Sequence, residues 1–239
     1  MPPRPHQEKL DENEKISYDK DGRNWAMRKQ TARQRADALC AAVLKRLEEK
    51  GITDPTPLSD LDAQYAVYHA ERDFARFGTE TLLRTLSELV ARRMACGPDF
   101  LLKVVIDRAM ETAAFLTEQH LNLLSLLFMC RHVRFDEIDS LQTLEAHLQY
   151  ICGQFPYEDV SAIEYLTALG CTQLNITDIP EAFSEQYGLP LEEIRPIIPE
   201  RIMRLNGDYG VGYTGIMLAI ANAEQKCRYR FDPKIWITG

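Results

Sequence analysis

The sequence contains no long apolar run. None of its stretches reaches the roughly 18 to 20 uncharged apolar residues that a bilayer-spanning helix needs. Residues 1–15 (MPPRPHQEKLDENEK) are polar and have no apolar core, so they do not make a secretory signal. These absences predict a cytoplasmic protein without a membrane-spanning segment.

The short motifs of common metal and catalytic sites are also missing. The six cysteines form no C-x-x-C pair, so neither a zinc ribbon nor a thioredoxin-type pair is indicated. No H-E-x-x-H, E-x-x-H, G-x-S-x-G or P-loop pattern occurs. We therefore expect no metal, no cofactor and no catalytic residue, and favour a protein without enzymatic activity. The histidines are interpreted as surface or hydrogen-bonded core residues: His69, His120, His132 and His147.

An excess of basic residues is absent as well. The chain has 28 Lys and Arg against 36 Asp and Glu, a formal net charge of −8. Phosphate backbones favour clustered cations, so this balance argues against nucleic-acid binding over the whole surface and leaves room for a local basic patch. With 239 residues, of which 45% are hydrophobic, the chain can bury a large core.

Helical periodicity is abundant between Trp25 and Gly170. Apolar residues recur there at helical spacing, and turn or cap residues separate the periods. In the second of these segments, residues 59–77, Leu61, Tyr65 and Tyr68 follow this spacing. We expect helices at 25–50, 59–77 and 158–169, and further helices that begin after the caps Thr79, Asp99, Thr117 and Ser140.

The segment from Leu121 to Met129 is apolar around the whole circumference of its expected helix. A helix that is apolar all round is buried on all sides, and this one is too short to span a membrane. We therefore predict an all-α fold, a multi-helix bundle around this central apolar helix, with a smaller irregular C-terminal region.

The composition changes after Gly170, where four prolines at 180, 190, 196 and 199 break the chain. Here the pattern predicts helices at 181–187 and 214–226. The segments CTQLNIT (171–177) and RYRFDPKIWITG (228–239) are typical of a short strand pair, or of a tail that docks on the bundle. We expect a mobile leader over 1–22, the bundle over 23–170 and the C-terminal region packed on it over 171–239.

One glycine pattern, Gly210-Val-Gly212-Tyr-Thr-Gly215, fits G-x-G-x-x-G directly before a helix. In dinucleotide-binding folds such glycines let the backbone approach a pyrophosphate, but only after a buried strand and within a βαβ unit. Only 24 residues follow Gly215, too few for that sheet. We interpret the pattern as a turn that leads into a helix.

A basic run is the candidate nucleic-acid site. No acidic residue lies between Arg23 and Arg35, and an aromatic ring that could stack on a base lies within the run. The alternative is a solvated helix face compensated by the acidic leader (Asp11, Glu12, Glu14, Asp19 and Asp21). The candidate residues are Arg23, Trp25, Arg28, Lys29, Arg33 and Arg35. A second candidate is the C-terminal unit, a helix followed by IWI, which has the outline of a winged-helix module but lacks a basic helix.

Four segments together carry a resemblance: DAQYAVYHAERDFARFGTETL, LTEQHLNLLSLLF, EYLTALGC and YTGIMLAIANAEQ…FDPKIWI. The chain from about residue 60 onward resembles an uncharacterised, mostly helical bacterial family known mainly by locus-tag names. None of these motifs is catalytic. The resemblance implies a bacterial cytosolic protein, in a phage-defence or stress-response setting.

Three functional hypotheses follow. The first is a helical interaction or adaptor protein that binds a protein partner or forms a homo-oligomer. The second is a nucleic-acid-binding adaptor that uses the basic run or the C-terminal unit. The third is an enzyme with a cleft between the bundle and the C-terminal region, where Tyr209, Tyr213 and the histidines supply polar groups.

Overall fold

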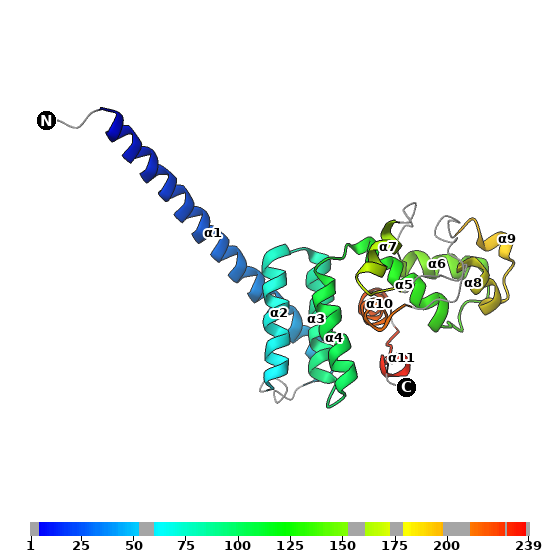
Figure 1. The fold of residues 1–239 in the computed structure, drawn as a ribbon. Coiled ribbons are helices and arrows are strands. Elements are labelled where there is room, and N and C mark those ends of the chain that lie inside the picture. Colours follow the sequence, from blue (N-terminus) through cyan, green and yellow to red (C-terminus); the bar gives the residue numbers. More distant parts are fainter. Residues whose placement is uncertain are drawn as a thin grey trace.

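The computed structural model describes residues 5–52, 60–152, 161–172, 179–197, 211–227 and 229–237. Its side chains are described from Trp25 onward, apart from those at positions 26, 130, 131, 152 and 179. Within these segments the chain forms eleven helices and no strand, which confirms the all-α prediction (Figure 1).

The helices follow one another in the order in which Figure 1 labels them. They are α1 (Pro5–Glu49), α2 (Leu61–Phe77), α3 (Glu80–Ala95), α4 (Phe100–Ala113), α5 (Glu118–His132), α6 (Leu141–Cys152), α7 (Ser161–Ala168), α8 (Ile179–Tyr187), α9 (Leu191–Ile194), α10 (Tyr213–Lys226) and α11 (Lys234–Ile237).

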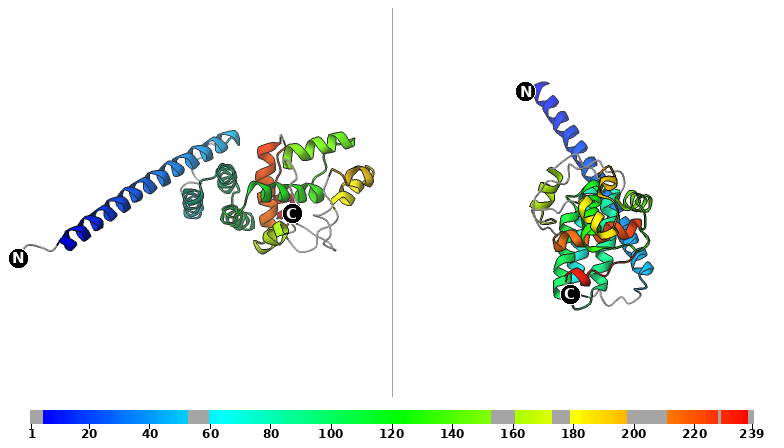
Figure 2. Two further views of the ribbon diagram at one scale, coloured as in Figure 1. Left: turned by 90° about the horizontal axis from the view of Figure 1, so that it is seen from above. Right: turned by 90° about the vertical axis from the view of Figure 1, so that its right-hand side faces the viewer.

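The helices form two groups that α10 joins. The first group contains α2, α3, α4 and the C-terminal part of α1, which contacts α2 and α3. The second group is built on α5, which contacts α6 and α8. Although α10 comes late in the sequence, it packs against α3 and α4 of the first group and against α5 and α6 of the second (Figures 1 and 2).

Two helices share the centre of the molecule. Every residue of α5 from Leu121 to Met129 is buried, as the sequence predicted. Every residue of α10 from Gly215 to Glu224 is buried too, and this was not expected of a C-terminal element. Small residues in α10 let its neighbours approach closely, so the core is centred on a pair of helices and not on α5 alone.

Polar side chains fix how α5 and α10 meet. Asn222 of α10 donates hydrogen bonds to Asn122 Oδ1 (3.1 Å) and Ser125 Oγ (2.9 Å) of α5. Ser125 in turn donates to the carbonyl oxygen of Ala219 (3.2 Å). All these groups are buried, so a shift of either helix would leave them without partners and would cost free energy.

Most helix ends lie where the sequence placed them. Thr79, Asp99 and Thr117 each accept a hydrogen bond from the backbone N–H three residues later and cap α3, α4 and α5. Ser140 likewise accepts from the N–H of Thr143 at the start of α6. The cap of α2 is Asp60, one residue after the expected start at position 59, which lies outside the described residues.

The stripe expected on α2 faces outward. Leu61, Tyr65 and Tyr68 are 79%, 64% and 61% exposed, while Ala63, Ala66, Ala70 and Phe74 make the buried face. Helical spacing alone could not decide between the two faces, because both repeat with the same period. The small alanines bring α2 close to its neighbours, and the tyrosines are left in solvent.

Of the two alternatives predicted for 228–239, a strand or a docked tail, the described residues 229–237 show the docked tail. They contain no strand, and Lys234–Ile237 is helix α11. Trp236 and Phe231 both pack edge-to-face on Phe128, with ring centroids 5.0 and 5.6 Å away. Of the expected strand 171–177, the described part is Cys171–Thr172, and Thr172 forms an isolated antiparallel bridge with Val211.

The expected boundary at residue 22 is not a break in secondary structure. Helix α1 is continuous from Pro5 to Glu49. The mobility predicted for the leader and the proposed division into regions stay predictions. The first described part of α1 extends away from both helix groups, and the N-terminus lies at its far end (Figures 1 and 2).

The glycine pattern before α10 serves close packing. The N–H of Gly212 donates to the carbonyl oxygen of Cys171 (2.9 Å). A Cβ at Gly215 would collide with that carbonyl oxygen and would lie 2.5 Å from Val211 Cγ1. The backbone of residues 170–172 therefore occupies the space where a phosphate would approach in a dinucleotide fold. Gly210 lies outside the described residues.

We expect Gly215→Ala to destabilise the protein by about 1–3 kcal/mol. Alanine is the better helix former by only about 0.5–1 kcal/mol, which does not offset a collision with backbone. Urea unfolding followed by circular dichroism measures the difference. The control Tyr213→Ala removes a half-exposed side chain two residues earlier and should change the stability by less than about 0.5 kcal/mol. Equal stability of Gly215→Ala and the native chain would contradict this packing argument.

Candidate functional site

The free part of α1 is the most prominent surface feature of the molecule. With 45 residues and a rise of 1.5 Å per residue, the helix is about 68 Å long. Among its described side chains, from Trp25 onward, the first buried one is Leu39, followed by Val43 and Leu47, which lie among the core residues. We call residues 5–34 the arm. Its described side chains between 25 and 34 are exposed, except for the half-buried Ala32.

The predicted nucleic-acid site lies on this arm. Trp25 is 65% exposed, and Lys29 Nζ lies 5.2 Å from its ring centroid. Arg28 and Arg33 are also exposed. The arm thus presents an aromatic ring and three cations to solvent on one turn after another. The side chain of Arg23 lies outside the described part of the structure.

Arg35 differs from the other predicted residues because the fold itself uses it. Its Nη1 donates to the carbonyl oxygens of Ala75 (2.7 Å) and Arg76 (3.3 Å), which lie in the last turn of α2. The last carbonyls of a helix have no intrahelical partner, and a guanidinium there satisfies them. Arg35 therefore anchors the base of the arm to α2.

Within the same helix the acidic leader can pair only with the first residue of the basic run, because Asp19 and Arg23 are four positions apart. Asp11 and Arg28 are 17 residues apart on a continuous helix, which separates their backbones by about 26 Å. Only side chains three or four positions apart meet on a helix surface. The intramolecular compensation expected for Arg28, Lys29 and Arg33 is therefore absent from this arrangement.

An open cleft of about 480 Å³ lies between α2, α4 and the end of α7. Two of its arginines are paired with neighbouring carboxylates: Arg72 with Asp73 (3.1 Å) and Arg108 with Glu111 (3.0 Å). Arg76 packs on the ring of Phe77 at 4.8 Å. The lining mixes both charges with apolar groups and leaves room for a small molecule. Tyr213, one of the polar groups expected in a cleft, does not line it and is half exposed at the start of α10, and Tyr209 lies outside the described residues.

The four candidate histidines, among the five in the sequence, make separate contacts. His69 packs against Tyr65 and Tyr68, and His120 completes the capping box of α5 with Thr117. Burial lowers the pKa of His120. Within the described side chains, no three His, Cys, Asp or Glu groups gather where they could hold a metal ion. The remaining two pack against aromatic rings: His132 and His147.

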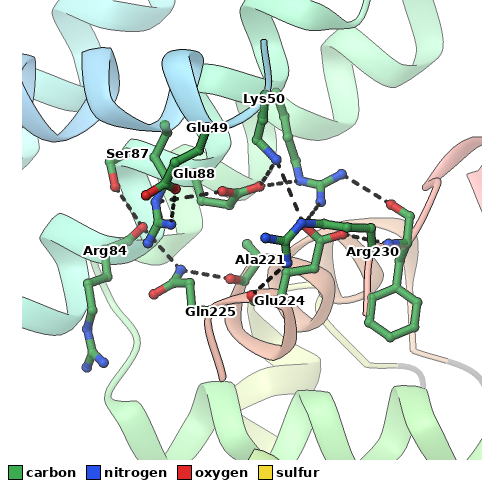
Figure 3. A network of polar contacts seen from close by, with 12 residues as sticks. Glu49, Lys50, Arg84, Ser87, Glu88, Ala221, Glu224, Gln225 and Arg230 are labelled. Carbon is green, nitrogen blue, oxygen red and sulfur yellow. Dashed lines mark hydrogen bonds and ion pairs between the residues drawn. The ribbon is translucent and has the colours of Figure 1, made fainter. Parts of the chain in front are cut away.

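A buried charge cluster joins α1, α3 and α10 (Figure 3). The carboxylates of Glu88 and Glu224 are only 4% and 3% exposed. Arg92 bridges them, with Nε 2.9 Å from Glu88 and Nη2 2.5 Å from Glu224. Lys50 Nζ lies 2.7 Å from Glu88 and 3.8 Å from Glu224. Glu224 also accepts the backbone N–H of Phe231 (2.6 Å), which ties the tail to the same cluster.

The cluster stabilises the negative form of its carboxylates. Burial by itself would raise the pKa of Glu88, but Arg92, Lys50 and Arg46 outweigh it and hold that pKa below the ordinary 4.5. Each carboxylate of the cluster has a cationic partner, and none of the cluster residues lines the cleft beside Arg76. Because its members come from the end of α1, from α3 and from α10, we interpret the cluster as a structural connection. Sequence reasoning missed it, since only Glu88 and Arg92 have a helical i,i+4 spacing, and nothing local links them to Lys50 or Glu224.

Three of the four described thiols are poorly suited to nucleophilic catalysis. The four described side chains, at Cys40, Cys96, Cys171 and Cys227, are free thiols. Burial raises the pKa of Cys171 to about 12, and it also raises the pKa of Cys96 and Cys227. A protonated thiol is a weak nucleophile. The side chain of Cys130 lies outside the described residues.

Comparison with known proteins gives one match. The model of an uncharacterised family, named after a locus tag, matches residues 27–207, about three quarters of the chain. The chain belongs to that family. The resemblance drawn from the sequence is thereby confirmed, although the matched range begins earlier than residue 60 and ends before α10. No curated protein and no solved structure shows significant similarity to the chain.

The family match includes the end of the arm. It begins at Met27 and so covers Arg28, Lys29, Arg33 and the anchor Arg35. Among the described helices, none combines the length and the apolar character that crossing a bilayer requires. The cytoplasmic location stays a prediction.

The charge cluster makes stability depend on pH in a defined direction. Because the folded-state pKa of Glu88 is lowered, its ionised form stabilises the fold above the ordinary value of 4.5. That contribution is lost as the pH falls through the folded-state value. We expect the native unfolding free energy to decrease more steeply below pH 4.5 than that of Glu88→Gln, measured by urea unfolding across pH. At neutral pH the variant should be less stable by about 1–3 kcal/mol.

The control for this measurement is Glu111→Gln. Glu111 pairs with Arg108 across the solvent-exposed surface, with side chains 52% and 63% exposed. Such pairs contribute little to stability, so this variant should follow the native pH profile. If Glu88→Gln also followed the native profile, Glu88 would not be held ionised by the cluster.

Proposed function

We propose that this protein is a helical adaptor whose main binding surface is the arm of α1. The observation that carries the proposal is the exposure of Trp25, Met27, Arg28, Lys29 and Arg33 on a helix segment that packs against no other described helix. An isolated helix is marginally stable in water, and most helices gain their stability from packing. A partner that packs on the arm would supply that stability.

The rest of the molecule supports an adaptor by acting as a rigid base. Arg35 fixes the arm to the end of α2, and the stripe from Leu39 to Leu47 packs it on α2 and α3. The charge cluster then connects the end of α1 to α10 through Lys50. The cleft beside Arg76 is the feature that would serve the alternative enzymatic hypothesis. A defence or stress-response role remains an expectation from the resemblance.

Site-specific crosslinking tests the proposal. A photo-crosslinking aromatic amino acid replaces Trp25 in one variant and Tyr150 of α6 in another, because the two side chains are exposed to the same degree, 65% and 66%. We expect covalent products through position 25 and none through position 150. Products through both positions alike, or none through position 25, would contradict binding by the arm. The mass of the product identifies the class of partner.

A nucleic-acid partner is the second candidate, and the exposed Trp25 with three exposed cations favours it. Binding would then weaken with salt, since each phosphate contact releases a counterion. We expect the logarithm of the affinity for single-stranded DNA to fall linearly with the logarithm of salt concentration. Changing Arg28, Lys29 and Arg33 to glutamine should reduce that slope by about 2.

Lys45→Gln is the control, because Lys45 lies on the packed part of α1 and is 75% exposed. It should leave the slope unchanged. Affinity that does not depend on salt, or that survives the triple substitution, would exclude nucleic-acid binding by the arm.

A further inference from the structure

We propose that the arm binds the arm of a second copy of this chain, in an antiparallel pair. This inference rests on the proposed function and names its partner. Along one continuous helix, residues 5–22 contain six acidic and three basic residues, while residues 23–35 contain five basic and no acidic residue. Within one chain only Asp19 and Arg23 have the spacing at which acidic and basic residues of the two halves meet on a helix. An antiparallel second copy places each half against its opposite.

The arm carries a seam with the spacing of a two-stranded coiled coil. Positions 18, 25, 32 and 39 are seven residues apart, and so are positions 15, 22, 29 and 36, which alternate with them at steps of three and four. The first series is Tyr, Trp, Ala and Leu, and the second is Lys, Gly, Lys and Ala, so the seam is apolar along one series and holds two lysines in the other. The contact between Lys29 and the Trp25 ring shows that the two series share a face. The seam continues into the buried stripe that starts at Leu39. Gly22 stands opposite Trp25 of the other copy in the register proposed here, where a small residue admits the indole.

The positions that flank this seam are complementary in charge. In the register that sets Gly22 against Trp25, position 12 lies beside position 33 of the other copy, and position 21 lies beside position 28. The sequence has Glu12, Asp21, Arg28 and Arg33 at these places. Positions 14 and 35, glutamate and arginine, form a third pair of opposite sign. Each pair occurs twice because of the two-fold symmetry, and no flanking pair brings like charges together.

This pattern fits a second copy better than it fits a nucleic acid. A phosphate backbone would be attracted by residues 23–35 and repelled by the acidic half that continues the same helix. A second copy satisfies both halves with one geometry. The exposed side chains of Arg28 and Arg33 are free to reach it, whereas Arg35 is already bound to α2, so the test uses the first two pairs.

A charge-exchange experiment on the full chain tests the pairing. One variant carries E12K and D21K, and the other carries R28E and R33E. Each variant alone turns four attractive pairs into repulsive ones, so its dimer dissociation constant should rise on the order of 100-fold. Mixed together, the two variants regain four attractive pairs and should form a heterodimer as stable as the native dimer. Sedimentation equilibrium measures the masses, and circular dichroism verifies that each variant is folded.

The matched control is K9E with K20E, which makes the same change of charge at two positions outside the basic run and on the helix face opposite the seam. It should dimerise as the native chain does. A native chain that stays monomeric, or a mixture of the two variants that stays monomeric, overturns the pairing. If the chain is monomeric but position 25 crosslinks to another macromolecule, the arm still binds a partner. In that case only the claim that the partner is a second copy of this chain is refuted. If position 25 gives no product at all, the proposed function fails as well.

Discussion

The contact between α5 and α10 is the constraint on which the rest of the structure depends. Both helices are buried over nine or more consecutive residues, and Asn222 and Ser125 hold them in one register. Each helix group alone would leave one wide apolar face in water. With α10 between them, the two groups share a single core, and the tail residues Phe231 and Trp236 pack on Phe128 of α5. The fold of this chain is therefore organised around α10, which lies outside the range that the family model matches.

Charge is used in two different ways in this molecule. In the cluster of Glu88, Glu224, Arg92 and Lys50, opposite charges are buried and satisfied, and they connect segments far apart in the sequence. On the arm, acidic and basic residues are separated along one helix, and the described basic side chains Arg28, Lys29 and Arg33 face solvent. The first arrangement fixes the relation of α1 to α10. The second leaves a pattern that another molecule can complete, which is what an adaptor needs.

Local signals in the sequence predicted most helices, but they did not show which helices would be the most deeply buried. A helix cap depends on only a few neighbouring residues, so the sequence is enough to predict it. The structure confirmed the caps Thr79, Asp99 and Thr117. The apolar circumference of residues 121–129 correctly indicated a buried helix. The central place of α10 depends on packing against helices more than 90 residues away, which no local pattern encodes. On the arm, the sequence predicted the basic residues. Only the structure shows that Arg35 binds the last carbonyl oxygens of α2, whereas Arg28 and Arg33 are exposed.

The position of α10 has a consequence for how the protein is made. During synthesis the ribosome delivers α1 to α9 first, and for that time the apolar faces of α3, α4 and α5 that α10 will cover stay open. Nascent chains with such exposed surface are the substrates that chaperones hold. The final fold can close only after residue 226 has left the exit tunnel, so a chain truncated before α10 would be recognised as incomplete by the proteases of the cell.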